Sequence, residues 1–531
     1  MNSKAPAAGL FSPLANRTFT SLWIASIVSN VGTAMQTVGA TWTLVQGGSG
    51  PTLVAALQAA GSAPLFLAGL PAGVLADIVD RRRLLIAANL WAALTAGGLA
   101  ALAFLHAAPP FVLLAATFAI GLGAAFSAPA FQAIVPELAS GPALTPAVAL
   151  NSIGVNIART IGPALGGIAV AAAGAPATFA LNAVSTLAVV WALAAWHRPA
   201  EQRRLPPEHF LGATRASVRY ARHAPGVRRI LIQAAVYFSL ASAPWALLPL
   251  VASDRLGLGA SGYGTLLGAL GLGAVAGALT LQRIRQRLGA KLLPLANLAC
   301  ATSGAALALV KTEVIALVTV AMFGAGWIAV LTVLNVGVQN AVAGWVRARM
   351  LALYVVVYFG AFAAGSMIWG RVASALGVPM TLVVAGGFAA LSTPLLARLQ
   401  AKPGATPDLT PAASSIPSLM LDPAEDHGAV LISNDYTVTA KNTDQFNAAM
   451  RSLRESRLRT GAFAWRHWID PDKPSFHRES FVIESWTEHL RQRLRRTVAD
   501  EAAEAQVAKL ASGKVLTARM RERPTPKTPH A

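Results

Sequence analysis

One arginine stands deep inside a long apolar stretch of this sequence. The residues of fixed charge nearest to Arg159 are Glu137 before it and Arg198 after it. A guanidinium within hydrocarbon is costly unless it faces a cavity or a partner group. We therefore interpret Arg159 as a residue that contacts a substrate or takes part in coupling. A structural ion pair or a hydrogen-bonded brace is the alternative.

Uncharged polar side chains inside other apolar stretches are further candidates for the same chemistry. Amides and hydroxyls within hydrocarbon must face protein or water. For any one of them, a hydrogen bond between helices is the stronger interpretation, and contact with a substrate is the weaker one. The candidates are Asn30, Gln36, Gln132, Asn156, Gln233, Tyr237, Asn335, Gln339, Tyr354 and Tyr358.

A dense group of charges lies in residues 73–83, between two apolar stretches. It contains Gly73, Asp77, Asp80, Arg81, Arg82 and Arg83. Three arginines in a short connection favour the cytoplasmic face of a membrane. The glycine permits close backbone approach, and Asp77 could meet the positive N-terminal end of a helix elsewhere. A turn that only sets topology is the alternative.

The composition requires many membrane spans to hold these residues. The 531 residues are 55% hydrophobic and 12% charged, with a mean hydropathy of +0.54, which excludes an ordinary soluble globular protein. The formal charge of +20 suggests contact with the membrane surface, and we do not expect nucleic acid as a partner. Twelve apolar runs are predicted, near residues 19–44, 53–75, 84–105, 111–134, 147–173, 177–196, 229–251, 261–281, 290–310, 314–338, 350–373 and 378–398.

The connections between the runs alternate in charge and predict the topology. Residues 81–83, 283–291 and 347–349 are basic, whereas the intervening short connections carry few Lys or Arg. Both termini are therefore expected in the cytoplasm, and the first run is read as a retained helix. Residues 1–196 and 229–400 form two six-helix bundles, joined by a basic cytoplasmic loop at 197–228.

The chain changes character after residue 400. Residues 401–427 are rich in Pro, Ala and Ser, which predicts a flexible linker. Within residues 428–531, alternating and helical apolar patterns predict a small cytoplasmic β-α-β-β-α domain with a tail. Asn442 is expected to cap its first helix.

Several chemistries are disfavoured. Cys300 is the lone cysteine, so an intrachain disulfide is impossible and a cysteine metal cluster is implausible. No cofactor is expected. No phosphate-binding loop occurs, which argues against direct ATP drive and leaves an ion gradient or facilitated transport. Carboxylates are missing from the span centres, and this weakens a proton-coupled mechanism.

The spacing of residues 73–83 resembles the signature between helices 2 and 3 of the major facilitator superfamily. Gly73, Asp77 and the final basic pair match, whereas Ile78 and Asp80 replace the usual arginine and glycine. The resemblance implies two six-helix halves around a substrate path. It also implies that Asp77 and the arginines latch the cytoplasmic side shut.

A second resemblance lies around Arg159. Gly162, Pro163, Gly166 and Gly167 match the Gly-Pro-x-x-Gly-Gly core of the helix 5 motif of superfamily antiporters, which is associated with export, although Ala158 replaces an upstream glycine. Residues 29–42, 127–138 and 156–167 look like the transmembrane secretion effector branch, which includes the enterobactin exporter. Membership implies export of siderophores or drug-like molecules, usually by proton antiport.

The C-terminal domain resembles the ferredoxin-like domain of antibiotic-biosynthesis monooxygenases, which pair into dimers. His467, His477, His489 and Trp465 could form a site, but the histidine spacing matches no metal template. A regulatory or dimerising role, through a homodimer, is the stronger interpretation. A membrane-tethered enzyme is the alternative, and quinol oxidation by residues 428–531 would distinguish it. A sensor that uses the transporter fold is a third possibility.

These observations predict an all-α polytopic membrane protein with twelve transmembrane helices in two six-helix bundles, followed by a small α+β cytoplasmic domain. The expected function is secondary active export of small amphipathic molecules across a bacterial inner membrane. Arg159 and the inward amides would shape the cavity, and the kink at residues 162–167 would set the resting state.

Overall fold

The computed structural model divides the chain into two compact units, and each is described by itself. Unit 1 comprises Met1–Pro207, Leu231–Asn335 and Ala352–Gln400, and unit 2 comprises Glu208–Ile230, Val336–Leu351 and Ala401–Ala531. The boundary passes through helices α7, α10 and α11. The structure describes residues 9–139, 141–196, 218–400, 408–412 and 428–522.

The first half of the helical part follows the predicted apolar runs closely. Its helices are α1 (Arg17–Gln46), α2 (Pro51–Ile78), α3 (Arg81–Phe104), α4 (Pro110–Leu138) and α5 (Leu144–Ala195). α5 comprises two helical arms that meet at Gly174, whose φ of 77° and ψ of 168° are non-helical. The positive φ requires a glycine, so two of the predicted runs form the two arms of one bent element.

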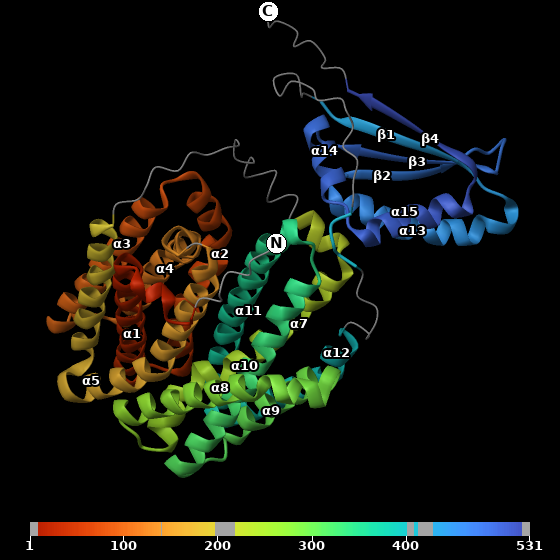
Figure 1. Cartoon of the computed structure of the whole chain (residues 1–531). Helices are drawn as coiled ribbons and strands as arrows, with labels where there is room; N and C mark the ends of the chain where they lie inside the picture. Colours follow the sequence, from red (N-terminus) through yellow and green to blue (C-terminus); the bar gives the residue numbers. More distant parts are fainter. Residues whose placement is uncertain (1–8, 140, 197–217, 401–407, 413–427, 523–531) are drawn as a thin grey trace, which may run out of the picture. The chain divides into compact units, whose positions relative to one another are not determined.

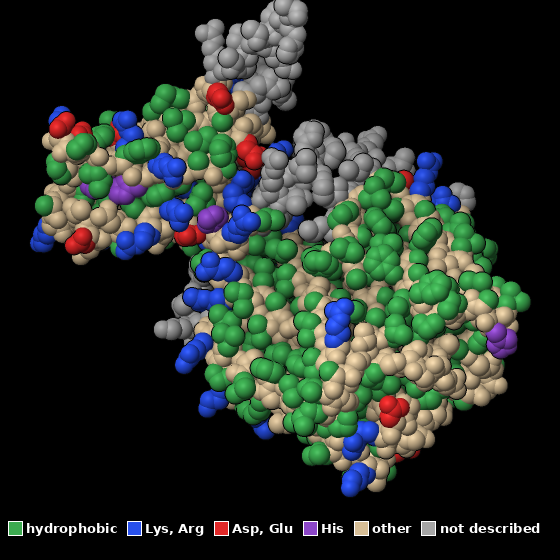
Figure 2. All heavy atoms as spheres, turned by 180° about the vertical axis from the view of Figure 1, so that it is seen from behind, with side chains coloured by type: hydrophobic (Ala, Val, Ile, Leu, Met, Phe, Trp, Pro, Cys, Tyr) green, Lys and Arg blue, Asp and Glu red, His purple; other side chains and the backbone are tan. Residues whose placement is uncertain are grey.

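The second half has the same character (Figure 1). Its helices are α7 (Pro225–Leu250), α8 (Ala260–Leu288), α9 (Leu292–Ala306), α10 (Glu313–Asn340), α11 (Arg347–Leu376) and α12 (Val378–Arg398). Each predicted run overlaps one of these helices. Figure 2 shows hydrophobic side chains spread over the face of the helical part, with most Lys and Arg side chains near its margins.

Nine segments of the described chain are long and apolar enough to cross a membrane. Two of them, Gly141–Ala195 and Ala260–Ala306, each contain two of the predicted runs. α1 is outside this set, and its polar residues Asn30, Thr33 and Gln36 lower its mean hydropathy. The chain is thus a mostly helical polytopic protein.

The charged group at residues 73–83 does not form the loop that its composition suggested. α2 continues to Ile78 and α3 begins at Arg81, so only a short turn separates the helices. Asp80 is the N-cap of α3, where its Oδ1 accepts a hydrogen bond from the Arg83 amide at 2.9 Å. An acidic N-cap satisfies a free amide and opposes the positive helix end, which explains this early helix start.

Unit 2 contains a four-stranded antiparallel sheet in the order β2-β3-β1-β4. Its strands are β1 (Val430–Thr437), β2 (Ala464–Ile469), β3 (Phe476–Ile483) and β4 (Ser512–Arg521), and its helices are α13 (Thr443–Thr460), α14 (Trp486–Leu494) and α15 (Val498–Leu510). The helices lie on one face of the sheet (Figure 1), where Ile432, Phe481 and Leu458 are buried together.

Three expectations for this region were wrong or incomplete. α15 and β4 were not predicted, because α15 has a single buried aliphatic residue, Val507, and β4 is interrupted by basic residues. Asn442 does not cap α13 through its side chain, which instead donates to the Leu510 carbonyl. Part of the predicted linker is ordered, because Pro411 pairs with Thr497. The rest of residues 401–427 lies outside the described residues.

Unit 2 also holds the residues that precede α7 and the connection between α10 and α11. Tyr220 packs edge-on against Trp345 with ring centroids 5.6 Å apart. The guanidinium of Arg495, just after α14, lies 4.6 Å from the centroid of Trp345. Residues 218–223 are helical, whereas residues 197–217 of the predicted central loop lie outside the described residues. The sheet domain therefore contacts a connection between two long helices.

Candidate functional site

Arg159 lies on the inner face of α5. One side of this helix packs against α1, where a Cβ on Gly162 would lie 2.7 Å from Ala34. Another side packs against α8, and an aliphatic side carrying Ile157 and Ile161 is exposed. At roughly 100° per residue, Arg159 projects between the α1 and α8 sides and away from the aliphatic side. Arg159 is exposed on this side of the helix.

Tyr358 of α11 is the group that the structure brings toward Arg159. The guanidinium lies within electrostatic range of the Tyr358 side chain, and the two residues belong to opposite halves. The centroid of the Tyr358 ring lies 4.2 Å from that of Phe238 and 6.2 Å from that of Trp327. A fixed cation from one half therefore lies within electrostatic range of one ring of an aromatic cluster in the other half.

Trp327 of α10 is the centre of this aromatic cluster. The indole is buried and contacts rings from α7, α10 and α11. Its ring neighbours are Tyr237, Phe238, Trp245, Phe323, Tyr358 and Phe362. Edge-on aromatic packing of this kind is rigid and presents apolar faces with a few polar groups. It suits a partner molecule that is partly aromatic or aliphatic.

The polar residues of α1 divide between two roles. Asn30, Thr33 and Thr37 are exposed and share one face of the helix. Gln36 is buried, and its Oε1 accepts a hydrogen bond from Asn182 Nδ2 at 2.6 Å. Asn182 Oδ1 in turn accepts from Thr33 Oγ1 at 3.1 Å. Gln36 is thus a brace between α1 and the second arm of α5, whereas Asn30 remains a cavity candidate.

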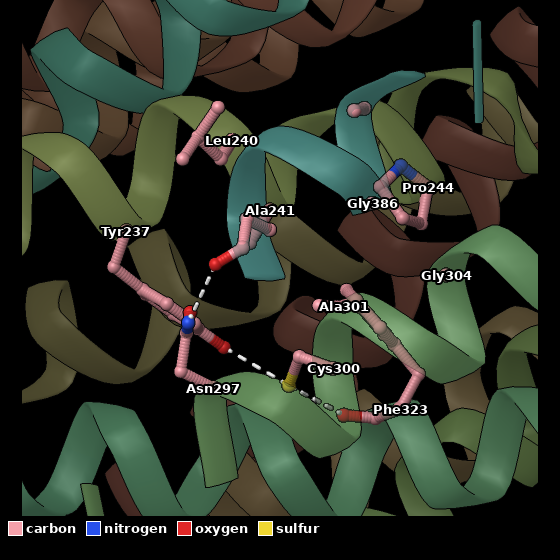
Figure 3. A pocket seen from close by; sticks show the side chains of 12 residues that line it. Tyr237, Leu240, Ala241, Pro244, Asn297, Cys300, Ala301, Gly304, Phe323 and Gly386 are labelled. Atoms are coloured by element: carbon pink, nitrogen blue, oxygen red, sulfur yellow. Dashed lines mark hydrogen bonds between the residues drawn. The ribbon is translucent and has the colours of Figure 1, made fainter. Parts of the chain in front are cut away.

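Gln233 and Tyr237 of α7 are also braces within their own half. Gln233 Nε2 donates to the Leu396 carbonyl of α12 at 2.8 Å. Figure 3 shows Tyr237 turned toward Cys300, with 3.2 Å between the hydroxyl and Sγ, at a narrow crevice between α7, α9, α10 and α12. Asn297 on the same crevice donates to the Ala389 carbonyl at 2.8 Å. These side chains are occupied with helix packing.

The remaining candidates have mixed positions. Asn156 is exposed on α5, and its Nδ2 donates to the Ser152 carbonyl at 2.8 Å. Gln132 is exposed on α4, and Tyr354 is buried beside the aromatic cluster. Asn335 and Gln339 of α10 are partly buried and engaged in interactions. Of this group, Asn156 lies closest to Arg159 along the helix.

The predicted gate residues bind partners within the first half. Arg81 Nη1 lies 2.7 Å from Glu137 Oε1 of α4. Arg82 donates to the carbonyls of Leu193 and Ala194 at 2.8 Å each, at the C-terminal end of α5. A guanidinium at a helix C-terminus satisfies free carbonyls and opposes the helix dipole. The Asp77 side chain lies outside the described residues, and Gly73 has open space around its Cα.

The two halves meet where α2 and α8 begin and α11 ends, which we call the closed end. Thr52 Oγ1 and Ser374 Oγ are 2.8 Å apart. The rings of Trp42 and Tyr263 stack with centroids 6.1 Å apart. Arg159 lies nearer the middle of the helices than these contacts, on the side toward the other end.

A family model described as the transmembrane secretion effector matches residues 8–522, which is nearly the whole chain. This chain belongs to the transmembrane secretion effector family. The family belongs to the secondary transporters of the major facilitator superfamily, and the chain is a multi-pass membrane protein.

One curated relative and two solved structures are similar to this secretion effector. The staphyloferrin A transporter of Staphylococcus aureus is 35% identical over 123 residues, which are 23% of this chain and 31% of that relative. A bacterial homologue of the human lysosomal transporter Spinster, inward-facing and unoccupied, has a TM-score of 0.60 at 15% identity and covers 73% of this chain and 98% of its own. A variant of the nucleoside transporter NupG has a TM-score of 0.61 at 13% identity, covering 72% and 100%. These two structures support the fold alone.

The sequence had not singled out several residues of the site in this secretion effector. Phe238 and Trp327 look like ordinary apolar residues of their runs, and nothing in the local pattern separates them from lipid-facing aromatics. Asn182 was overlooked among the apolar residues of its run. Thr33 and Thr37 did carry a signal, since they share a helical face with Asn30.

The helix 5 glycines have a packing role that the structure makes specific. A Cβ on Gly166 would lie 2.7 Å from the Met35 Cα of α1, and one on Gly167 would lie 2.5 Å from the Ala260 oxygen of α8. Such approaches permit two helix backbones to touch, as small residues do within membranes. Gly162 and Gly166 hold α5 to its own half, whereas Gly167 holds it to the other half.

Replacing Gly167 with leucine should open the closed end and lower transport about tenfold, because the side chain would occupy the space of the α8 backbone. Spin labels at positions 49 and 376 would report the change as a longer distance across the closed end. Gly98→Leu is the matched control, since a Cβ there meets nothing within 4 Å. An unchanged label distance in the Gly167 variant would contradict this assignment.

Proposed function

We propose that this secretion effector is a twelve-helix secondary active transporter of a bacterial inner membrane that exports small amphipathic molecules. Both termini lie in the cytoplasm, two six-helix bundles alternate access to a central site, and inward proton movement drives export. The observation that carries the proposal is the exposed Arg159 on the inner face of α5, facing Tyr358 and the aromatic cluster.

The substrate class follows from the two kinds of surface at this site. A guanidinium binds carboxylate or phenolate oxygens through charge-assisted hydrogen bonds. The rings around Trp327 accept aromatic or aliphatic portions of the same molecule. A siderophore or a drug-like acid has both features, and the partial match to a staphyloferrin A transporter favours the siderophore class.

The state of the molecule fits the loading step of an exporter. With the termini in the cytoplasm, the closed end faces outward. Arg159, Asn30 and Gln132 are exposed on the cytoplasmic side of that closure. A substrate could therefore reach Arg159 from the cytoplasm. Asp77 and the arginines would then close the cytoplasmic side during the other half of the cycle, and the Gly-Pro motif at residues 162–167 of α5 would favour the resting state.

Cells with and without the protein should differ in the accumulation of a panel of siderophores and dyes. We expect lower accumulation of at least one acidic amphipathic compound in cells that contain the protein, and recovery of accumulation when a protonophore removes the proton gradient. Equal accumulation of every compound would contradict export, whereas export that persists with the protonophore would contradict proton coupling alone.

The C-terminal domain is proposed to pair with a second copy. The face of the sheet opposite the helices exposes Leu516, Met520 and Trp468. Its strand order matches a ferredoxin-like arrangement, β-α-β-β-α-β with an added helix. Cross-linking of full-length protein in membranes through a cysteine at position 516 tests this pairing. The enzymatic alternative has little support, because the three histidines do not form one site. His467 Nε2 and His477 Nδ1 are hydrogen-bonded at 3.0 Å, whereas His489 lines a cavity that includes neither of them.

A further inference from the structure

A polar cavity lies within the C-terminal domain, between the sheet and its helices. It contains about 610 Å³ of empty space, part of which is open to solvent. Residues from β1, β3, β4, α13, α14 and α15 line it. The charged and imidazole-bearing members of the lining are Arg457, His489, Arg493, Arg496, Glu504 and Arg519.

Positive charge exceeds negative charge in this lining. Arg457 pairs with the buried Glu479 at 3.1 Å and also with Glu504. Arg496 pairs with Glu504 at 2.6 Å. Arg496 also lies 3.7 Å from Glu501, so three glutamates pair with Arg457 and Arg496. Arg519 projects from the edge strand β4 on the side of the sheet that faces the cavity, as its register partner Ile432 does.

Two side chains of the lining have buried polar atoms with no hydrogen-bond partner. His489 is only 3% exposed, and neither ring nitrogen makes a hydrogen bond of good geometry, although Gln492 acts on the imidazole as a hydrogen-bonding neighbour. Arg496 Nε is buried and unpartnered as well. Buried polar atoms of native proteins nearly always have a partner, so each exception calls for an explanation. A bound molecule with acceptor oxygens would supply one here.

The electrostatics of the cavity agree with this geometry. Burial together with the charges of Arg519 and Arg493 lowers the pKa of His489 to about 4. Burial and the nearby Arg496 and Arg519 lower the pKa of Arg493. The imidazole is therefore neutral at neutral pH, chiefly because it is buried and in addition because cations surround it. An anion placed among these groups would relieve their repulsion and favour a protonated His489.

We propose that this cavity binds a small multivalent anion, a metabolite that carries phosphate or carboxylate groups. The arginines supply forked N–H donors that match such groups, and His489 supplies a further donor once the anion is present. Cytoplasmic placement of the domain would give it access to phosphorylated and polycarboxylic metabolites. The site is separate from Arg159 and stands independently of the transport mechanism.

Calorimetry on full-length protein in nanodiscs tests the proposal with pyrophosphate, citrate and inorganic phosphate as probes. We expect at least one of the three to bind wild type, and Arg519→Gln to weaken that binding about tenfold, the usual size of one lost charge-assisted contact. Arg519 is exposed, so its replacement leaves the fold intact. Arg466→Gln is the matched control, because Arg466 is exposed on β2. The affinity of this variant for the anion should stay within about twofold of that of wild type.

Histidine hydrogen exchange read by mass spectrometry gives a second measurement on the same samples. The pKa of His489 should rise when the anion that binds is saturating. Three results would each overturn the proposal: no binding of any probe, equal weakening by Arg519→Gln and Arg466→Gln, or an unchanged pKa of His489 in the bound state.

Discussion

Replacement of Arg159 by glutamine is expected to reduce transport about a hundredfold, the effect of removing one member of a charge pair that is shielded from water. Glutamine keeps much of the length of the side chain and its ability to donate hydrogen bonds, but it lacks the charge. Arg159→Lys should recover part of the activity, because an ammonium keeps the charge and loses the planar fork. Transport of the identified substrate into inverted membrane vesicles measures both variants.

A loss of charge elsewhere in the helical part supplies the control for Arg159. Lys311→Gln removes a cation from an exposed position in the connection between α9 and α10, and it should leave transport unchanged. Membrane content of each variant separates lost function from lost protein. Full transport by correctly inserted Arg159→Gln would remove this residue from the mechanism and with it the proposed substrate site.

Replacement of Glu479 by alanine is expected to destabilise the C-terminal sheet by about 3–5 kcal/mol. The carboxylate is fully buried and accepts hydrogen bonds from Asn434 at 2.7 Å, Trp465 at 3.0 Å and Arg457 at 3.1 Å. Its removal would leave the guanidinium of Arg457 without its buried partner. Amide hydrogen exchange of β1 and β3 in the full-length protein measures the free energy of opening.

The pH dependence of the stability of the sheet is a second measurement of the contribution of Glu479. Burial raises the pKa of this carboxyl, but the charge of Arg457 and three hydrogen bonds outweigh burial and hold the pKa below its usual value. Its contribution to stability is therefore complete above a pH of about 4.3 and is lost as the pH falls toward the lowered value. Glu479→Gln should lack this part of the acid sensitivity.

The exposed pair of Asp435 and Arg478 offers a matched control. It joins the same two strands, with Arg478 Nε 2.6 Å from Asp435 Oδ1, and the Arg478 side chain is 49% exposed. Asp435→Asn should change the opening free energy by less than about 1 kcal/mol. Equal effects of Glu479→Ala and Asp435→Asn would show that burial of the carboxylate contributes nothing.

The helices could be located from hydropathy, because each run of apolar residues must satisfy its backbone internally to enter a bilayer. Their ends were less predictable. The arginines at 81–83 suggested a loop, yet Asp80 caps α3 and the helix begins at once. In the C-terminal domain, α15 and β4 have weak apolar patterns, so periodicity did not reveal them.

The candidate site shows the same division more sharply. Sequence alone singled out Arg159 as a candidate, since a charge in an apolar run needs a cavity or a partner group, and it singled out the glycines around Pro163. It named Gln36, Gln233 and Tyr237 as candidates and favoured hydrogen bonds between helices for each, and the structure shows such bonds without the sequence having told which candidates would make them. Which face of a helix turns inward depends on its neighbours, and a local pattern does not contain them.

The amino-acid sequence alone established a polytopic helical protein with a separate α+β domain, because hydropathy and alternation are properties of neighbouring residues. Only the tertiary structure decided that Tyr358 faces Arg159 and that His489 lies among arginines from three elements. Those arrangements arise when residues far apart in the chain are packed together. The full set of contacts then decides whether each buried polar atom has a hydrogen-bond partner.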